Sequence, residues 1–230
     1  MQTVLEKLDT PREKHVSNIP LVLIHDGRGT IFQYYMLGPL YRHTYGIAYP
    51  YFDDGGMPEG GVPQIAMKYA EAIRRDIRKG PVLIGGVGWS FGGMIALEVA
   101  RLLQDDARLS VVGLLMIDSY CPWSTSHRNR GRVRPSYRVT TSEKTKEKVN
   151  RCFDAAREMI LSWDRPPAFS PPPTVLIRAT ETMPLANSPD GLQTLTDSDG
   201  KLGWSEYESF KILSVIDVPG DHFSMFADSR

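Results

Sequence analysis

The chain has 230 residues, of which 41% are hydrophobic, so it can bury a substantial core and we expect one domain over residues 1–230. Its 27 Lys and Arg balance 27 Asp and Glu, so net charge favours neither nucleic acid nor an anionic membrane as a partner. The two cysteines are too few for a disulfide scaffold. The charged N-terminal stretch lacks the apolar segment of a secretion signal, and no run reaches membrane-spanning length, so we expect a soluble cytoplasmic protein.

Short apolar runs alternate with helical patterns along the chain. The runs are unbroken, which is typical of strands that are covered on both faces. Strand, helix and strand in repetition predict the α/β class, with a mostly parallel sheet flanked by helices. The expected strands are Leu21–Ile24, Tyr45–Ala48, Val82–Ile84, Val111–Ile117, Thr174–Ile177 and Ile212–Val218. The expected helices between them are Val62–Arg78 and Phe91–Gln104.

Residues 119–172 form the longest connection between two predicted strands. A connection of this length predicts a functional insertion, which we interpret as a lid. Its second half, Ser142–Trp163, has the pattern of an amphipathic helix with Ser142 as the N-cap. The prolines of RPPAFSPPP then predict an extended return to the sheet. Between Arg128 and Arg151 the lid contains the basic residues Arg128, Arg130, Arg132, Arg134, Arg138, Lys144, Lys146, Lys148 and Arg151, against only Glu143 and Glu147.

The motif GWSFG, residues 88–92, stands between a predicted strand and a predicted helix. Glycines two positions before and after Ser90 permit a sharp turn that lifts the serine hydroxyl above the sheet. The further glycines Gly86 and Gly93 would let the strand and the helix approach closely. The pattern predicts Ser90 as a nucleophile, and the alternative is a serine that only caps the helix.

A serine hydroxyl becomes an effective nucleophile only when a base removes its proton. Of the five histidines, His222 follows the last predicted strand in a glycine-containing loop, at the edge where parallel sheets carry their chemistry. His25 is the rival, but it precedes the serine, whereas the expected chain order is serine, acid, histidine. We interpret His15, His43 and His127 as solvated side chains.

The third residue of such a site is an acid that orients the imidazole. Asp118 ends the strand after the nucleophile helix and is the preferred candidate. Glu181 follows the next strand and is the alternative acid. Asp217 falls within a strand, and Asp221 adjoins His222 too closely to fold back onto it.

The negative oxygen that forms during acyl transfer needs hydrogen-bond donors. We expect one from the backbone amide of Phe91, directly after the nucleophile, and one from Gly27 in the loop IHDGRG, with Asp26 as a near alternative. Gly27 and Gly29 read equally well as ordinary loop glycines. No paired His or Cys has metal-ligand spacing, so no metal is expected.

Four motifs resemble one family: IHDGRG, GWSFGGMIALEVARLL, MIDSYCPW and GDHFSMF. From Ile19 to Phe226 the chain resembles the thioesterase domains of polyketide synthases and nonribosomal peptide synthetases, within the α/β-hydrolase fold, with features of the fungal polyketide type. In many members an aspartate followed by serine supplies the acid at the position of Asp118, although some stand-alone relatives place the acid one strand later. The resemblance implies no cofactor, and a substrate tethered through the phosphopantetheine of an acyl carrier protein.

The resemblance also implies the reaction and the partners. The acyl chain would pass to Ser90 and leave by hydrolysis or by intramolecular cyclisation. The expected partners are an acyl carrier protein and synthase modules, and a basic lid would attract an acidic carrier, unless it is simply a solvated charge run. The chain departs from the family by ending eight residues after His222, where relatives continue into a helix. Three alternatives stay open: a stand-alone editing thioesterase of type II, a general carboxylesterase, and a binding module without turnover.

Overall fold

The computed structural model describes residues 3–10, 17–86, 91–125, 137, 139–167, 169–181, 183–184, 192–193 and 200–225. Its strands are β1 Glu6–Asp9, β2 Ser17–Ile24, β3 Arg42–Ile47, β4 Gly80–Gly86, β5 Leu109–Ile117, β6 Thr174–Ala179, β7 Met183–Pro184, β8 Leu192–Gln193 and β9 Ile212–Val218. Its α-helices are α1 Gly61–Ile77, α2 Phe91–Leu102 and α3 Glu143–Leu161, with 3-10 helices η1 Phe32–Met36 and η2 Trp204–Glu206.

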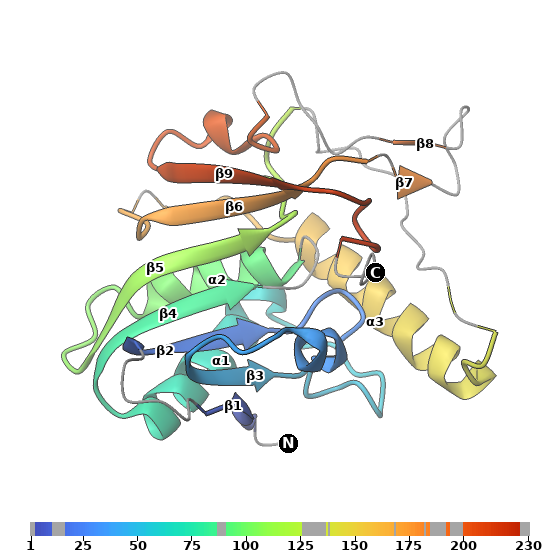
Figure 1. Cartoon of the computed structure of the whole chain (residues 1–230), viewed down its shortest axis with the longest axis horizontal. Helices are drawn as coiled ribbons and strands as arrows, with labels where there is room; N and C mark the ends of the chain where they lie inside the picture. The colour runs from blue at the N-terminus through green and yellow to red at the C-terminus, as the bar shows by residue number, and fades with distance from the viewer. Residues whose placement is uncertain are drawn as a thin grey trace.

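The main sheet has the strand order β1-β3-β2-β4-β5-β6-β9 (Figure 1). Every neighbouring pair in it is parallel except β1 and β3, so the α/β class is confirmed. All six predicted strands are present. The sequence prediction missed β1, because four residues with three charges carry no apolar run, and such a composition suits a short strand at a sheet edge.

The sheet packs one face against α1 and α2. Side chains alternate between the two faces, so Leu114 and Met116 of β5 join the large core on the helix side, while Leu115 and Ile117 point to the other side. Residues 91–100 of α2 are all buried. Nine of these ten residues are apolar or glycine, as expected of a helix within the core, and the one charged residue, Glu98, pairs with Arg101 at 2.6 Å.

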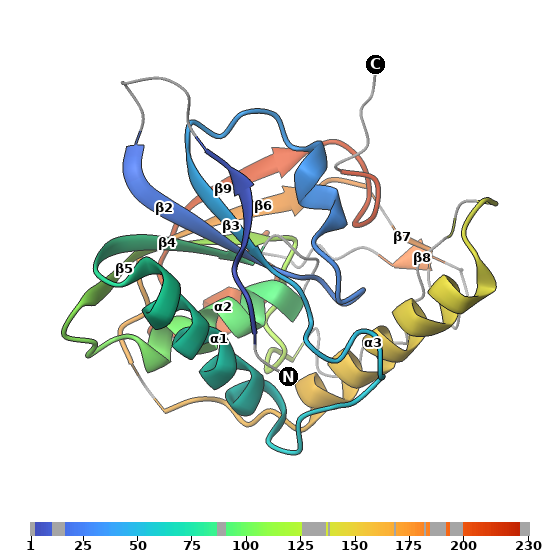
Figure 2. The same ribbon diagram turned by 90° about the horizontal axis from the view of Figure 1, so that it is seen from below.

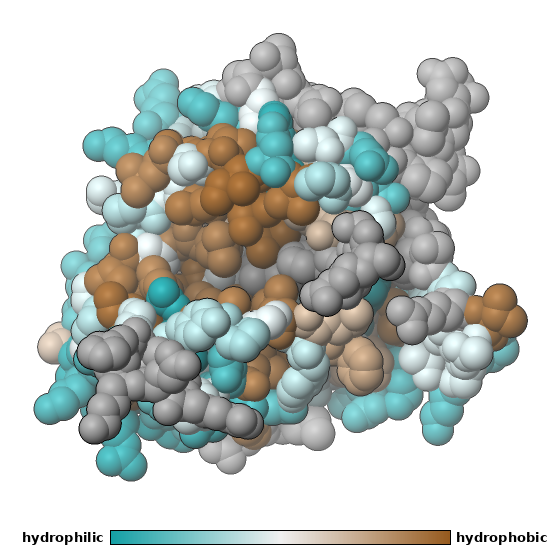
Figure 3. Space-filling model, in the orientation of Figure 1, coloured by the Kyte–Doolittle hydropathy of each residue, from teal (hydrophilic) through white to brown (hydrophobic). Residues whose placement is uncertain are grey.

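The opposite face of the sheet is covered differently along its width. Ile31 and Tyr34, from η1 and its N-cap, pack over the β2 side together with Leu21 and Leu23. Over β5, β6 and β9, apolar side chains gather at the surface (Figure 3), and Ile216 is 47% exposed there. The two faces therefore differ in how deeply they bury their apolar residues.

The parallel strands end at one edge of the sheet, and α3 lies beyond that edge (Figures 1 and 2). The predicted N-cap is confirmed, since Ser142 Oγ accepts a hydrogen bond from Thr145 N at 3.2 Å. Cys152, Ala156 and Met159 form the buried side of α3. No described helix has the length and apolar character needed to cross a bilayer. Helix α3 thus covers the edge of the sheet at which the predicted site residues Asp118, after β5, and His222, after β9, are located.

Candidate active site

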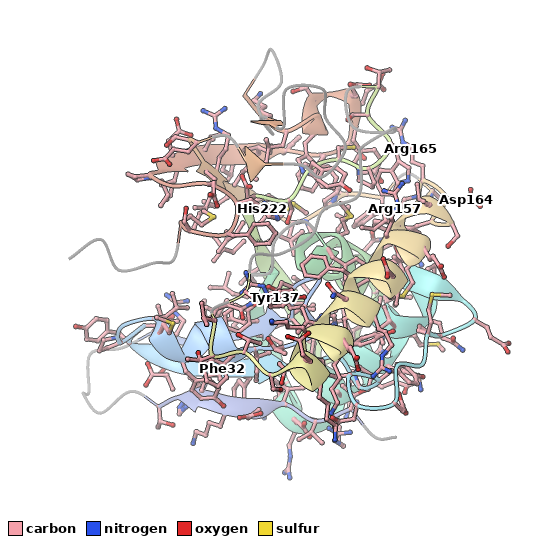
Figure 4. All side chains as sticks on the ribbon, turned by 90° about the vertical axis from the view of Figure 1, so that its right-hand side faces the viewer. Phe32, Tyr137, Arg157, Asp164, Arg165 and His222 are labelled. Atoms are coloured by element: carbon pink, nitrogen blue, oxygen red, sulfur yellow. The ribbon has the colours of Figure 1, made fainter. Side chains whose placement is uncertain are left out.

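Asp118 and His222 meet at the carboxyl edge of the sheet. Asp118 follows the last residue of β5, and His222 stands four residues after the end of β9. His222 Nδ1 lies 2.5 Å from Asp118 Oδ2, although 104 residues separate them in the chain. Asp118 is fully buried and His222 is 5% exposed. Figure 4 shows His222 on the side of the molecule along which α3 runs.

The backbone of Asp118 has an unusual conformation. Its φ is +46°, in the left-handed region that non-glycine residues seldom occupy and that is often found at functional sites. Asp118 N donates to Ile177 O at 2.7 Å, and Asp118 Oδ1 accepts from Ala179 N at 3.0 Å. Because Ala179 of β6 binds Asp118 Oδ1, Asp118 Oδ2 faces the imidazole of His222.

The other carboxylates considered from the sequence have different contacts. Glu181 Oε1 accepts from Gly220 N at 3.2 Å, and Glu181 N donates to Gly220 O at 3.0 Å. Asp217 pairs with Arg178 at 2.8 Å across β6 and β9. Glu181 therefore fixes the loop that precedes the histidine, and Asp217 ties two strands together.

Asp221 organises the turn that carries His222. Its Oδ1 accepts hydrogen bonds from Phe223 N at 2.6 Å and from Ser224 N at 2.9 Å, while Asp221 N donates to Ser224 Oγ at 2.8 Å. These bonds direct the Asp221 carboxylate into its own turn. The loop residues around the histidine are thus fixed through their backbone.

The predicted nucleophile, Ser90, lies outside the described residues, as do Gly88 and Trp89. Phe91, the next residue, is buried and begins α2. Phe91 and Gly27, the two predicted oxyanion residues, line one recess together with His25, Asp26, Gly29, Tyr49, Cys152, Ala156 and Met159. The structure therefore brings the two residues together beside the N-terminus of α2.

Residues Asp26–Gly29 form a tight turn. Gly29 N donates to Asp26 O at 2.9 Å, and Gly29 has a φ of +78°, which favours glycine. Asp26 Oδ1 accepts from Arg28 N at 2.8 Å. Among the described residues, none accepts a hydrogen bond from the Gly27 amide. This geometry leaves the Gly27 N–H free of partners within the described part of the chain.

His25 is built into the core. Its Nδ1 lies 2.6 Å from Asp26 O, a carbonyl that can only accept, so Nδ1 carries the hydrogen and Nε2 accepts from Tyr69 OH at 2.7 Å. Burial lowers the pKa of His25 to about 4. Both ring nitrogens are engaged and the ring is neutral, so His25 does not compete with His222 as a base.

His43 differs from the prediction. The sequence suggested a solvated side chain after a loop, but His43 lies within β3 and is half-buried, with its Nδ1 enclosed. The apolar run on which the prediction rested began only at Tyr45, so the polar first half of the strand was missed. His15 and His127 lie outside the described residues.

Three side chains form a cover beside His222. Phe153 of α3 approaches Phe223 with ring centroids 6.5 Å apart, and the Arg28 guanidinium lies 5.3 Å from the Phe223 centroid. A Cβ added to Gly27 would lie 2.9 Å from Phe153 Cε1. Phe153 of the lid helix α3 therefore packs directly against Gly27 of the predicted oxyanion loop.

The lid charges are partly neutralised. Lys146 pairs with Glu143, as the sequence allows, and Lys148 pairs at 2.6 Å with Asp53, an acid outside the lid. The arginines from Arg128 to Arg138 lie outside the described residues. In the described part of the lid, these ion pairs offset some of the positive charge.

Neither thiol has the features of a reactive cysteine. Cys121 and Cys152 are buried, and burial raises their pKa values to about 11 and about 12. Thiols with such values stay protonated and are poor nucleophiles. Across the described ranges, no group of three or more His, Cys, Asp or Glu side chains is arranged to hold a metal ion.

The chain is similar in sequence to several proteins named as thioesterases. The chain is 35% identical over 231 residues to Thioesterase frbE of Dothideomycetidae sp., covering 95% of this chain and 87% of that protein. It is 34% identical over 215 residues to Thioesterase AMT4 of Alternaria alternata, covering 90% and 78%. The probable thioesterase gloN of Glarea lozoyensis is 35% identical over 236 residues, covering 90% and 83%.

Solved structures identify the fold. The NocB thioesterase domain from the nocardicin cluster superimposes with a TM-score of 0.71 at 24% identity, over 98% of this chain and 92% of that one. YbtT, a type II thioesterase of the yersiniabactin pathway, gives 0.70 at 15% identity, over 99% and 94%. The protein has the α/β-hydrolase fold. Residues 19–230 match the Thioesterase domain family model, and the chain belongs to this family.

Proposed function

We propose that this protein releases an acyl chain from the phosphopantetheine thiol of a carrier protein through an ester on Ser90. The observation that carries the proposal is the 2.5 Å contact between His222 Nδ1 and Asp118 Oδ2, in a member of the thioesterase family. A buried carboxylate on one imidazole nitrogen leaves the other nitrogen to act as a base. A serine before the first residue of α2, on the chain's GWSFG motif, fits the nucleophile for that base.

The reaction follows from these roles. His222 Nε2 takes the proton of the Ser90 hydroxyl as its oxygen attacks the thioester carbonyl, and Asp118 stabilises the imidazolium. The amides of Phe91 and Gly27 donate to the negative oxygen of the tetrahedral intermediate. Its collapse breaks the C–S bond, and the His222 imidazolium gives its proton to the departing phosphopantetheine sulfur, which leaves as a thiol while the acyl chain stays as an ester on Ser90. Water, or a nucleophile within the acyl chain, then gives its proton to the neutral His222 as it attacks the ester. His222 returns that proton to the Ser90 oxygen as the product leaves.

The partners in this proposal are an acyl carrier protein and synthase modules. The chain is 39% identical over 122 residues to the nonribosomal peptide synthetase imqB of Aspergillus flavus, a match that covers 53% of this chain and 4% of that protein. Similarity to a synthetase supports a carrier-bound substrate. That the acyl chain is a polyketide, and that the protein works in the cytoplasm, are parts of the same proposal.

A second candidate function is removal of stalled short acyl groups as a type II editing thioesterase. The similarity to YbtT over 94% of that chain favours it. Carrier proteins loaded with acetyl or with long acyl groups separate the two candidates, when each is mixed with the protein and release is followed by intact mass. Preference for acetyl supports editing, and preference for long chains supports product release.

Point variants test the site itself. Ser90→Ala should lower kcat on an acyl thioester by about 10⁶-fold, and Asp118→Asn by about 10⁴-fold, because the imidazole loses its orienting partner. Glu181→Gln is the matched control, since it alters a neighbouring carboxyl that holds only the loop backbone, and it should leave kcat close to that of the wild type. A severe loss in Glu181→Gln with an active Asp118→Asn would contradict the assignment of the acid.

A further inference from the structure

The residue after Asp118 is held by a tryptophan from a distant part of the chain. Trp204 Nε1 donates a hydrogen bond to Ser119 O at 2.7 Å, across 85 residues of sequence. Trp204 is 1% exposed and Ser119 is fully buried, so water does not replace this bond. A buried carbonyl that loses its donor costs about 1–3 kcal/mol.

Helix α2 holds the other side of Ser119. A Cβ added to Gly93 would lie 2.1 Å from Ser119 Oγ and 2.7 Å from Ser119 Cβ. Ser119 therefore packs directly on the backbone of the helix that follows the predicted nucleophile. The sequence assigned Gly93 to contact between helix and strand, and a Cβ there would also lie 3.4 Å from Met116 Cγ of β5, but the nearest atoms belong to Ser119.

Trp204 itself is rigidly placed. Its ring stacks on Phe210 with centroids 4.5 Å apart and an interplanar angle of 29°. Leu202 and Gly203, just before it, have φ values of +55° and +80°. Leu202 O accepts a hydrogen bond from Cys121 N at 2.8 Å, a second tie to the segment after β5. The segment before β9 thus supports the turn after β5 at two points.

We propose that Trp204 is a positioning residue for Asp118, an inference that rests on the proposed function. Asp118 keeps a φ of +46°, a conformation that persists only where the surroundings impose it. The indole N–H of Trp204 holds the carbonyl of Ser119, the residue after Asp118, and Ser119 lies between α2 and η2. Without that bond the peptide after Asp118 rotates to find another donor, and the Asp118 carboxylate moves off His222 Nδ1.

The test compares two substitutions in the same aromatic cluster. Trp204→Phe keeps a ring on Phe210 and removes the N–H, and it should lower kcat on a small acyl thioester by about 10- to 100-fold with KM nearly unchanged. Tyr207→Phe is the matched control, because Tyr207 OH is buried with no hydrogen-bond partner among the described residues. It should leave kcat at the level of the wild type.

A double variant distinguishes positioning from simple loss of structure. If Trp204 acts through Asp118, adding Trp204→Phe to Asp118→Asn should cause little further loss of kcat. The downfield proton resonance of the hydrogen bond between His222 and Asp118, identified by its loss in Asp118→Asn, should weaken or shift in Trp204→Phe. Independent, multiplicative losses and an unchanged resonance would overturn the proposal.

Two further controls complete the experiment. If Trp204→Phe folds poorly, replacement of Trp204 by 3-benzothienylalanine keeps the ring shape and removes only the N–H, and it should give the same loss of kcat; wild-type kcat with this residue would overturn the proposal. Failure of the proposed function looks different, because Asp118→Asn would then retain full activity. An impaired Asp118→Asn with a fully active Trp204→Phe refutes the positioning role alone.

Discussion

Asp26 is a fully buried carboxyl group beside the predicted oxyanion residue. Burial raises its pKa to about 7, and the opposing attraction of Arg28, whose Nε lies 3.7 Å from Asp26 Oδ2, only partly offsets this. Asp26 Oδ2 has no hydrogen-bond partner among the described residues. The turn that presents the Gly27 amide therefore contains a group that changes charge near neutral pH.

The raised pKa of Asp26 predicts a specific pH dependence of stability. A group whose pKa is about 7 when folded and 3.8 when unfolded contributes stability below pH 4 that is lost as pH rises to 7. Asp26→Asn keeps the acceptor for Arg28 N but does not titrate. From pH 4 to pH 8 the unfolding free energy of the wild type should fall relative to this variant by up to about 4 kcal/mol.

Chemical denaturation at several pH values measures this difference directly. The lowered pKa of His25 acts in the opposite sense, removing stability as pH falls below 6.5, but both proteins share it, so it cancels in the comparison. Parallel curves for Asp26→Asn and the wild type would show that burial does not perturb Asp26.

At the scale of elements, α3 and the turn after β2 are in steric contact. Gly27→Ala should push Phe153 outward, since the new Cβ would lie 2.9 Å from its ring, and the resulting shift of the turn should lower kcat/KM by about 10- to 100-fold. Adding Phe153→Ala should restore most of the loss. Gly38→Ala is the control, because a Cβ there has no neighbour within 4 Å. If the double variant is as impaired as Gly27→Ala alone, the contact is not the cause.

The elements that sequence analysis predicted well are those with strong local signals. The apolar runs of β4, β5 and β9, the N-cap Ser142, and the contact of Asp118 with His222 all follow from pattern, spacing and the chain order of parallel sheets. The residues alone left both Asp118 and Glu181 open as the acid, and the family resemblance added to the preference for Asp118. The contact geometry then agrees with the preferred choice.

The features that the sequence did not predict depend on tertiary contacts. Trp204 has no local pattern linking it to Ser119, 85 residues away, because only the packing of η2 against the turn after β5 brings them together. The ion pair of Lys148 with Asp53 likewise joins segments that are distant in the chain. The buried state of His25 follows from its contacts with Tyr69 and Asp26, which a strand-end position alone does not reveal.

At the scale of the whole molecule, the net charge is zero, but the charged residues are unevenly distributed along the chain. Arg130, Arg132 and Arg134 stand in the part of the lid outside the described residues. Changing all three to Gln should raise KM for an acyl carrier protein about tenfold at low salt, while KM for a small thioester stays constant. The comparison of the two KM values separates docking of the carrier protein from the reaction of the acyl group.

A charge-matched variant controls for net charge. Lys68, Arg75 and Arg78, on α1 and at its C-cap, carry the same number of positive charges on another part of the surface. Their change to Gln should leave KM for the carrier protein unchanged. An equal effect of both triple variants, or an effect of the lid variant that does not weaken with added salt, would contradict guided docking.

The central claim is that Ser90, Asp118 and His222 act as one unit, and labelling with a fluorophosphonate tests it most directly. Intact-mass measurement should show one phosphonyl adduct on Ser90 in the wild type, none in Ser90→Ala, and a rate slowed by orders of magnitude in His222→Ala and Asp118→Asn. Labelling on another residue, or at an unchanged rate in His222→Ala, would contradict the account.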